Sequence, residues 1–193
     1  MSFNTLSYSV CDSNLNSDLL DFATQYALFD EMSDFSEDDR HVLGTHSKYA
    51  DPAMETILLM LQKRVEEVTN LELFPTYSFY RVYRKGAVLK KHLDRPSCEI
   101  STTVFLGRSD ETSWPIFMQN TPISLERGQM VVYRGCELEH WRDAMPGTED
   151  SWHVQGFFHY VDKNGPNSEY KWDKRQSIGM PEQLLPYYIQ KTS

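Results

Sequence analysis

The chain has 193 residues, of which 40% are hydrophobic and 13% aromatic, a composition that suits one well-buried globular domain. Its formal net charge of −9 argues against general binding to the phosphate backbone of nucleic acids, because like charges repel. The apolar runs are too short to cross a bilayer and the N-terminus lacks the pattern of a signal peptide, so we expect a cytoplasmic protein without a membrane span.

Residues 1–74 are expected to form the helical N-terminal part of a single domain that spans residues 1–193. The segment from Asp18 to Phe29 is predicted to be a short helix, and the acidic stretch over 30–39 is predicted to be a solvated loop. We interpret residues 1–50 as an accessory N-terminal part.

The clearest helix follows these segments. Asp51 suits the N-cap, Pro52 suits the first helical position, and Asn70 can end the helix. Apolar residues recur at helical spacing between these ends: Met54, Ile57, Leu58, Leu61, Val65 and Val68. We expect this stripe to pack against a flat apolar surface in the core.

From residue 75 the pattern changes to short strands, which are expected to form the core of the domain over 75–163. Pro, Gly, Asn and Asp separate the candidate strands, which are 77–83, 88–92, 99–106, 114–118, 123–125, 130–133, 137–142 and 152–161. This pattern predicts a mainly β fold with flanking helices, of the α+β class, in which helices buttress a sandwich or open barrel. The remaining residues, 164–193, are expected to be an extended tail that docks through Leu184, Leu185, Tyr187 and Tyr188.

The strongest candidate for chemistry is the triplet His92-Leu93-Asp94. Residues i and i+2 of a strand point to the same face, so one imidazole and one carboxylate would face a common cavity. His140, near the end of a later strand, is the natural third ligand. Two imidazole nitrogens and one carboxylate on one side of an ion form a facial triad, which leaves the opposite coordination positions open. Because His-x-Asp also occurs by chance, the surrounding sequence is needed to distinguish a metal site from a chance match.

The surrounding sequence favours the metal site. Tyr83-Arg84-Lys85-Gly86 leads into KKHLDRP, and the segments EISTTVFLG, ERGQMVVYRG, LEHWRD and WHVQGFFHYVD follow in order. In the order and spacing of these motifs, residues 75–162 resemble the 2-oxoglutarate/Fe(II)-dependent dioxygenase superfamily, in particular its prolyl-4-hydroxylase-like branch. The resemblance implies a double-stranded β-helix, or jelly roll, with helices packed on one sheet. It also implies that His92, Asp94 and His140 bind Fe(II).

The resemblance further implies a reaction. Enzymes of this family bind 2-oxoglutarate at Fe(II) and couple its oxidative decarboxylation by O2 to oxidation of a substrate C–H bond, usually as a hydroxylation. We therefore expect Fe(II) as the cofactor, 2-oxoglutarate and O2 as co-substrates, and a prime substrate that is a small molecule or a peptide. Fold similarity does not identify that substrate.

The sequence departs from the family at the residue that holds the far carboxylate of 2-oxoglutarate. The family places an Arg or Lys shortly after the distal His, whereas the segment DAMPGTEDSW contains neither. Arg142 is one candidate, because two residues after His140 it would face the same cavity and its guanidinium suits a carboxylate. His153 opens the last strand and Tyr83 matches a family tyrosine, so both are also predicted to bind the co-substrate. For Arg81 we expect a place at the rim of the pocket.

Other functions remain open at this stage. A cupin-like metalloenzyme that does not use 2-oxoglutarate would share the jelly roll, although the His-x-His motif usual in cupins is absent. A non-catalytic jelly roll that binds a metal or another ligand is the second alternative. A nucleic-acid demethylase is the third, and the net charge argues against it. The basic residues clustered between Arg81 and Arg95 would attract a dianionic co-substrate or an acidic substrate.

Overall fold

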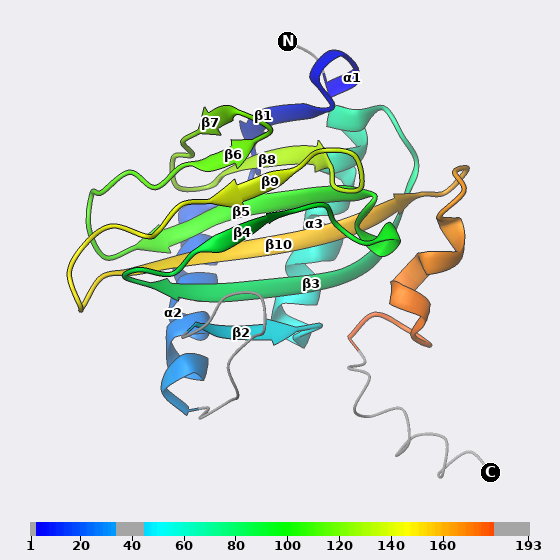
Figure 1. Ribbon diagram of the computed structural model, residues 1–193. Coiled ribbons are helices and arrows are strands. Elements are labelled where there is room, and N and C mark those ends of the chain that lie inside the picture. Colours follow the sequence, from blue (N-terminus) through cyan, green and yellow to red (C-terminus); the bar gives the residue numbers. More distant parts are fainter. Residues whose placement is uncertain (1–2, 34–44, 180–193) are drawn as a thin grey trace, which may run out of the picture.

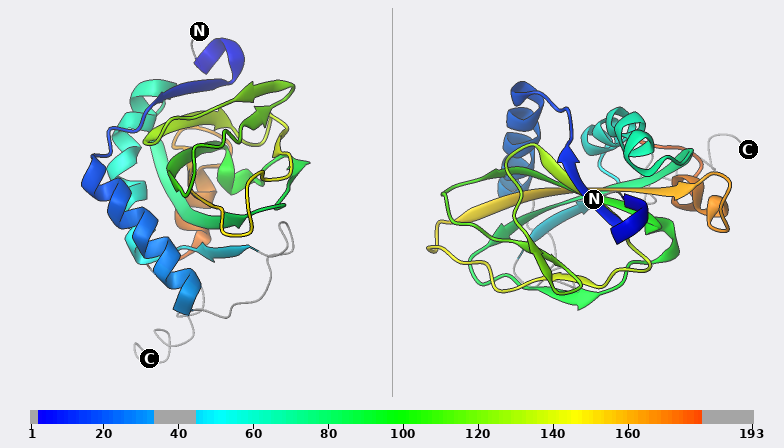
Figure 2. Two further views of the ribbon diagram at one scale, coloured as in Figure 1. Left: turned by 90° about the vertical axis from the view of Figure 1, so that its left-hand side faces the viewer. Right: turned by 90° about the horizontal axis from the view of Figure 1, so that it is seen from above.

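Two facing antiparallel sheets and a layer of helices make up the fold (Figures 1 and 2). The computed structural model describes residues 3–33 and 45–179. Within them the larger sheet has six strands in the order β1-β8-β5-β10-β3-β2, and the smaller has four in the order β4-β9-β6-β7. From β3 onward the chain passes back and forth between the two sheets, with β6 and β7 as a hairpin within the smaller one, as in a jelly roll, so the predicted mainly β fold with flanking helices is confirmed.

The strand boundaries agree closely with the sequence pattern. The larger sheet contains β1 (Tyr8–Asp12), β2 (His46–Tyr49), β3 (Leu73–Arg84), β5 (Ile100–Arg108), β8 (Gln129–Arg134) and β10 (Trp152–Asp162). The smaller sheet contains β4 (Leu89–His92), β6 (Ile116–Met118), β7 (Thr121–Ile123) and β9 (His140–Arg142). Each of the eight predicted strands therefore overlaps one of the strands from β3 to β10. The overlap is smallest for the segment over 123–125, which shares only the last residue of β7.

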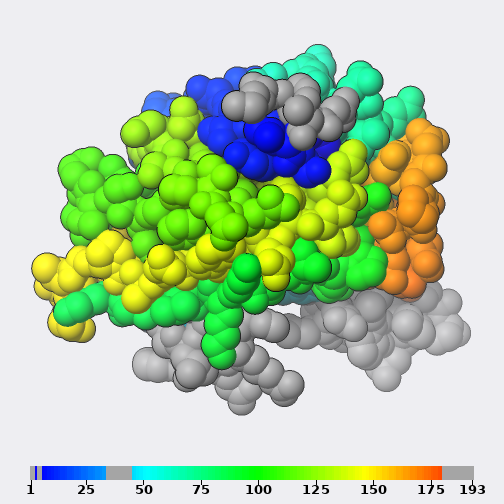
Figure 3. All heavy atoms as spheres, turned by 45° about the horizontal axis from the view of Figure 1, so that its top comes forward, coloured from blue at the N-terminus to red at the C-terminus, as the bar shows by residue number. Residues whose placement is uncertain are grey.

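The N-terminal part is less purely helical than predicted. It contains α1 (Phe3–Leu6), α2 (Ser17–Ser33) and α3 (Pro52–Thr69), but also the strands β1 and β2. These strands lie at the two edges of the larger sheet, where β1 pairs with β8 and β2 with β3. Both are short and only partly buried, so they show little of the hydrophobic alternation that reveals a strand. Figure 3 shows the N-terminal segment (blue) lying against green-coloured parts of the chain.

The main helix begins and ends where its sequence predicts. The Asp51 carboxylate accepts hydrogen bonds from the backbone N–H groups of Ala53 (2.9 Å) and Met54 (3.2 Å). At the other end Asn70 adopts a left-handed conformation, with φ of 56°, and donates its backbone N–H to Glu66. The predicted stripe packs against the larger sheet, as expected.

Alternation along β3 and β10 separates the core from the cavity. The side chains of Tyr80 and Val82 join the hydrophobic core beneath α2 and α3, together with Val154 from β10. The intervening residues, among them Arg81 and Tyr83, face the space between the two sheets. One face of the larger sheet thus packs into the hydrophobic core, and the opposite face lines the cavity, where a ligand can bind.

After β10 the chain turns back in the 3₁₀ segment η2 (Ser168–Lys174), whereas an extended tail was predicted. Arg175 follows this segment and forms a buried ion pair with Glu55 of α3, which anchors the segment to the domain. The predicted docking residues Leu184, Leu185, Tyr187 and Tyr188 lie outside the described residues. Among the helices that are described, none is both long and apolar enough to span a membrane.

Candidate metal centre and co-substrate site

The structure brings the three predicted metal ligands together. His92 ends β4 and His140 begins β9, and the two residues are direct partners across this antiparallel pair. Asp94 lies just beyond β4, and its Oδ1 is 3.6 Å from Nε2 of each histidine. The ligand atoms of all three residues lie within 4.8 Å of one another. Two ligand atoms that each lie about 2.1 Å from the same ion can be separated by up to about 4.2 Å. A small inward movement of the three side chains would therefore let them bind an ion.

Backbone hydrogen bonds orient both histidines toward this point. His92 donates from Nδ1 to the carbonyl of Lys90 (2.7 Å), and His140 donates from Nδ1 to the carbonyl of Leu138 (2.9 Å). A carbonyl only accepts, so Nδ1 carries a proton in each ring, and in the neutral ring Nε2 carries the lone pair. Burial also lowers the pKa of His140, which favours the neutral, ligating form.

Asp94 is held from both sides by neighbouring groups. Its backbone N–H donates to the carbonyl of Gly135 (2.9 Å), and its Oδ2 accepts a hydrogen bond from Ser101 (2.8 Å). A Cβ atom on Gly135 would overlap Oδ2 of Asp94 and the carbonyl of Cys98, so only glycine fits there. These contacts leave Oδ1 directed toward His92 and His140. Such supporting contacts commonly fix the orientation of a metal ligand.

A second group of ligand-type residues adjoins Asp94. The ligand atoms of Asp94, Cys98 and His159 also lie within 4.8 Å of one another. In this group, however, His159 Nδ1 is 2.9 Å from the Ser101 hydroxyl and Cys98 Sγ is 3.0 Å from the Tyr77 hydroxyl. Burial lowers the pKa of His159 to about 4, so this ring is neutral at pH 7. We interpret the group as support for Asp94.

The triad opens into a cavity of about 610 Å³, a volume within the usual range for ligand sites. Six aromatic side chains line part of the cavity, which are Tyr49, Tyr77, Phe79, Tyr83, Tyr133 and Phe157. Its charged lining residues are Arg81, Asp94 and Arg95. The site therefore combines a polar metal-binding corner with apolar walls.

The predicted co-substrate residues fall into two places. Tyr83 lines the large cavity, whereas Arg142 and His153 line a separate small space of about 10 Å³. The rings of Tyr83 and Trp114 meet edge to face, with centroids 4.8 Å apart, between the two spaces. Arg142 is fully buried on the same strand as His140, as the spacing of two residues predicts.

The Arg142 guanidinium has neutral partners only. It donates to the carbonyl of Trp114 and to the side-chain oxygen of Gln155, and it forms no ion pair with any residue that the structure describes. Burial lowers its pKa to about 10, because a charge is poorly solvated there. His153 also contacts Gln155, at 2.9 Å, and burial together with the charge of Arg142 lowers its pKa to about 3. Arg142 is thus a buried cation beside a neutral histidine.

Arg81 is buried rather than at the rim. Only 4% of the residue is exposed, and its guanidinium carbon lies 5.2 Å from the ring centre of Phe79 and 5.5 Å from that of Tyr83. The rim prediction for Arg81 was therefore wrong. The parity of β3 could have revealed this position, since Phe79, Arg81 and Tyr83 alternate with core residues.

Comparisons with known proteins support the fold. No protein-family model matches the chain, and a search of curated proteins finds no match. Among solved structures, a Pseudomonas putida prolyl-4-hydroxylase matches with a TM-score of 0.60 and 17% identity, over 81% of this chain and 94% of that chain. HygX from Streptomyces hygroscopicus, with nickel, 2-oxoglutarate and hygromycin B bound, matches with a TM-score of 0.62 and 16% identity, over 84% and 85%.

EctD from S. alaskensis, with 2-oxoglutarate and 5-hydroxyectoine, gives a TM-score of 0.62 and 13% identity, over 83% of this chain and 74% of that chain. At these identities the matches establish the fold and not the activity. The fold is the double-stranded β-helix of 2-oxoglutarate/Fe(II)-dependent dioxygenases, with a possible metal site formed by His92, Asp94 and His140.

Proposed function

We propose that this protein is an Fe(II)- and 2-oxoglutarate-dependent oxygenase that hydroxylates its prime substrate. The observation that carries the proposal is the convergence of three lone-pair atoms, Nε2 of His92, Nε2 of His140 and Oδ1 of Asp94, in the corner of a large cavity. When bound, Fe(II) and 2-oxoglutarate would supply the oxidising chemistry. The protein's own residues would bind the metal and the co-substrate, orient the substrate and exclude water.

The donor set fits Fe(II). Two neutral imidazoles and one carboxylate on one side of the ion match the facial triad, and the cavity lies on the open side. Without a cation, the Oδ1 of Asp94 faces two nitrogen lone pairs, which is an unfavourable arrangement. A divalent ion would turn this repulsion into attraction.

We assign the far carboxylate of 2-oxoglutarate to Arg142. Among the described residues Arg142 has no carboxylate partner. A buried cation in this state costs roughly several kcal/mol, and an anionic ligand would offset that cost. Residues i and i+2 of a strand are separated by about 6.6 Å. This distance is comparable to the length of a five-carbon dicarboxylate, so 2-oxoglutarate could extend from a metal at His140 to Arg142. Because the space around Arg142 is about 10 Å³, the rings of Tyr83 and Trp114 would have to move apart.

His153 has a supporting part in this assignment. Its neutral ring donates from Nε2 to the Gln155 oxygen, which also accepts from Arg142. Gln155 in turn donates to Thr103 (2.5 Å), so its oxygen is held toward Arg142. We therefore assign His153 to positioning Arg142, and Tyr83 to the wall between the metal and the far carboxylate.

The test is the visible spectrum of the protein mixed with Fe(II) and 2-oxoglutarate without oxygen. A 2-oxo acid chelated to Fe(II) gives a metal-to-ligand charge-transfer band, and we expect this band in the wild type. Its absence would contradict the proposed function, whereas metal binding without the band would favour the cupin-like alternative. Admitting oxygen should then yield succinate.

Arg142→Met tests the assignment of the far carboxylate. We expect it to weaken 2-oxoglutarate binding by roughly 10–100-fold, on the scale of one charge-assisted pair, with Fe(II) binding retained. Arg108→Met is the matched control, because Arg108 lines the same small space but pairs with Glu111 (2.9 Å). The apo form of Arg142→Met should also be more heat-stable, since an unpaired buried charge is removed. Equal 2-oxoglutarate affinity in Arg142→Met and wild type would contradict the assignment.

A further inference from the structure

Arg142 is closed off from the cavity that contains the triad. The space beside it, about 10 Å³, is near the smallest volume that holds one water molecule, so it is too small for a carboxylate. The rings of Trp114 and Tyr83 meet between this space and the large cavity. Among the described residues, Nε of Arg142 has no hydrogen-bond partner. A ligand that reaches this guanidinium from the large cavity therefore requires one of the two rings to move.

The two rings differ in how firmly the chain holds them. Tyr83 lies in β3, which runs between β2 and β10 in the larger sheet, and its direct partner on β10 is His153. Trp114 belongs to the segment 109–115, which connects β5 to β6 outside the strands, and the three residues before it are exposed. A ring carried by a connecting segment can swing without breaking a sheet. Trp114 is therefore the ring that can move.

The contacts that keep the Trp114 ring closed are modest. Its Nε1 donates to the carbonyl of Asp143 (2.8 Å), and Asp143 also lies outside the strands, directly after β9. The ring otherwise packs in a small apolar cluster that is separate from the main hydrophobic core. Opening would break one neutral hydrogen bond and loosen this small cluster, and the main core would stay intact.

Arg142 is coupled to Trp114 by two contacts. Its guanidinium carbon lies 4.6 Å from the centre of the Trp114 ring, and one of its nitrogens donates to the Trp114 carbonyl. A carboxylate forms stronger, charge-assisted hydrogen bonds with a guanidinium than a neutral carbonyl does, so it would compete for this donor. The position of the ring is thus linked to whether Arg142 holds an anion.

We propose that Trp114 is a movable cover over Arg142, which swings aside when a carboxylate of a ligand in the large cavity binds the guanidinium. The inference rests on the proposed function for the identity of that ligand, 2-oxoglutarate, whereas the movement itself requires only a suitable anion. A 2-oxo acid without a far carboxylate could occupy the triad without opening the cover. The apparent affinity for 2-oxoglutarate then depends on the fraction of molecules that are open.

Fluorine NMR can follow the movement at Trp114 itself. We would label the four tryptophans with 5-fluorotryptophan, assign the Trp114 resonance by its loss in Trp114→Phe, and load the protein with Zn(II), which is diamagnetic. The matched ligands are 2-oxoglutarate and 2-oxopentanoate, which carries a methyl group in place of the far carboxylate. We expect 2-oxoglutarate to shift the Trp114 resonance and 2-oxopentanoate to leave it in place.

The controls for this experiment lie within the same chain. The resonance of Trp172, in η2, should respond to neither ligand. Arg142→Met should abolish the response of Trp114 to 2-oxoglutarate, because the anion then has no partner behind the ring. Equal responses of Trp114 to the two ligands, or a response that persists in Arg142→Met, would overturn the proposal.

Trp114→Phe separates a cover from an ordinary packed side chain. It removes the hydrogen bond to Asp143 and so raises the open fraction, and we expect 2-oxoglutarate to bind roughly fivefold more tightly. The affinity for 2-oxopentanoate should match that of the wild type, which also shows that the variant folds. Isothermal titration of both ligands checks this, and an unchanged or weaker affinity for 2-oxoglutarate would contradict the cover.

The charge-transfer band separates this proposal from the proposed function. If the band forms with Fe(II) and 2-oxoglutarate while the Trp114 resonance does not move, the oxygenase proposal stands and the cover is overturned. If no band forms, the oxygenase proposal fails, and glutarate titrated into the metal-free protein still tests the cover, because this dicarboxylate needs only Arg142. A Trp114 resonance that glutarate leaves unchanged would then overturn the cover as well. We expect both the band and the shift.

Discussion

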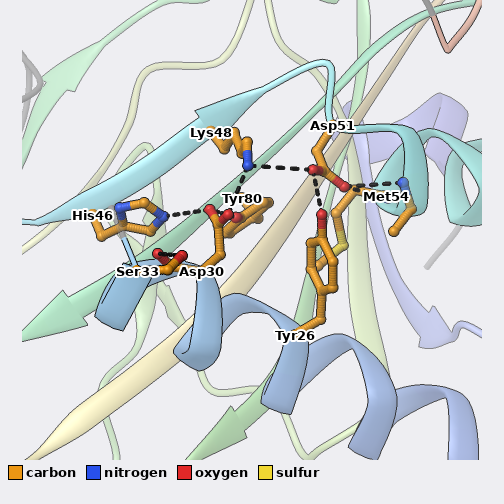
Figure 4. Close-up of polar contacts among 9 residues, drawn as sticks. Tyr26, Asp30, Ser33, His46, Lys48, Asp51, Met54 and Tyr80 are labelled. Atoms are coloured by element: carbon orange, nitrogen blue, oxygen red, sulfur yellow. Dashed lines mark hydrogen bonds and ion pairs between the residues drawn. The ribbon is translucent and has the colours of Figure 1, made fainter. Parts of the chain in front are cut away.

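Two clusters in this molecule are each built around an aspartate, and they differ in what the carboxylate faces. Inside the barrel, Oδ1 of Asp94 faces the lone pairs of two imidazole nitrogens. Outside the larger sheet, Asp30 at the end of α2 is surrounded by donors (Figure 4). His46 Nε2 lies 2.8 Å away and Lys48 Nζ 2.6 Å away, and the Tyr80 hydroxyl also donates to it.

The Asp30 cluster joins the helical layer to the sheet. His46 and Lys48 belong to β2 and Tyr80 to β3, so one carboxylate connects three elements. Burial alone would raise the pKa of Asp30, but the hydrogen bonds from Lys48, Tyr80 and His46 outweigh it and lower the pKa. Nearby, Asp51 caps α3 and also accepts from the Tyr26 hydroxyl (2.7 Å; Figure 4).

The difference separates structural from functional carboxylates. A carboxylate whose oxygens accept hydrogen bonds from cationic and hydroxyl donors already has its charge balanced, and it stabilises the fold. A carboxylate held rigidly against other acceptors lacks a positive partner, which a metal ion can provide. Both clusters contain Asp and His, so composition alone does not distinguish them.

The largest expected effect comes from making the same substitution, Asp to Asn, in each of the two clusters and comparing the results. Asp94→Asn should lower Mn(II) affinity by more than the roughly 10–100-fold typical of losing a supporting contact, because it removes the only charged ligand of the triad. Asp30→Asn should leave Mn(II) affinity unchanged. Isothermal titration of both variants checks this, and similar losses in the two would contradict the distinction.

Gly135→Ala should damage the Asp94 cluster without touching a ligand. The added methyl group overlaps the Asp94 carboxylate and the Cys98 carbonyl, so we expect weaker Mn(II) binding and a destabilisation of about 1–3 kcal/mol. Gly86→Ala is the control, because nothing lies within 4 Å of its Cβ position, so any loss of stability there reflects backbone strain at its φ of 81° and should leave metal binding unchanged. Normal metal affinity in Gly135→Ala would show that Asp94 does not depend on this close contact.

Ser101→Ala should have a smaller effect on the same cluster. Loss of the hydrogen bond to Oδ2 frees the Asp94 carboxylate to rotate, and we expect roughly 10-fold weaker Mn(II) binding. Ser151→Ala removes a similar bond, at 2.7 Å, between a serine and Asp110 away from the triad, and should not change metal affinity. Equal metal affinities for the two variants would argue against the supporting role of Ser101.

The smallest effect concerns stability alone. Asp30→Asn should reduce the free energy of unfolding by about 1–3 kcal/mol near neutral pH, since hydrogen bonds to a charged group are weakened. The pKa of Asp30 is lower in the folded protein than the usual value of about 3.9 in unfolded chains, so its stabilisation is present above that pH and is lost as the pH falls through the folded pKa. Denaturant unfolding at several pH values should show the variant approaching the wild type below about pH 4. A constant difference across this range would contradict the assignment.

The sequence by itself determined the features that depend on local periodicity and short spacing. The ends of α3 follow from Asp51, Pro52 and Asn70, because capping is decided within one turn of helix. The strands follow from alternation and from turn residues. The pair His92 and Asp94 could be predicted because residues i and i+2 of an extended segment point to the same face, although β4 itself ends at His92.

Only the tertiary structure decided which charges meet which partners. Arg81 and Arg142 are far apart in sequence, and their placement in separate spaces depends on how β3 and β9 sit in opposite sheets. The donors around Asp30 likewise come from two strands, β2 and β3, and the carboxylate from α2, and no spacing rule connects these elements. The energy of a charge depends on its neighbours in space, so its role is settled when the sheets and helices pack together.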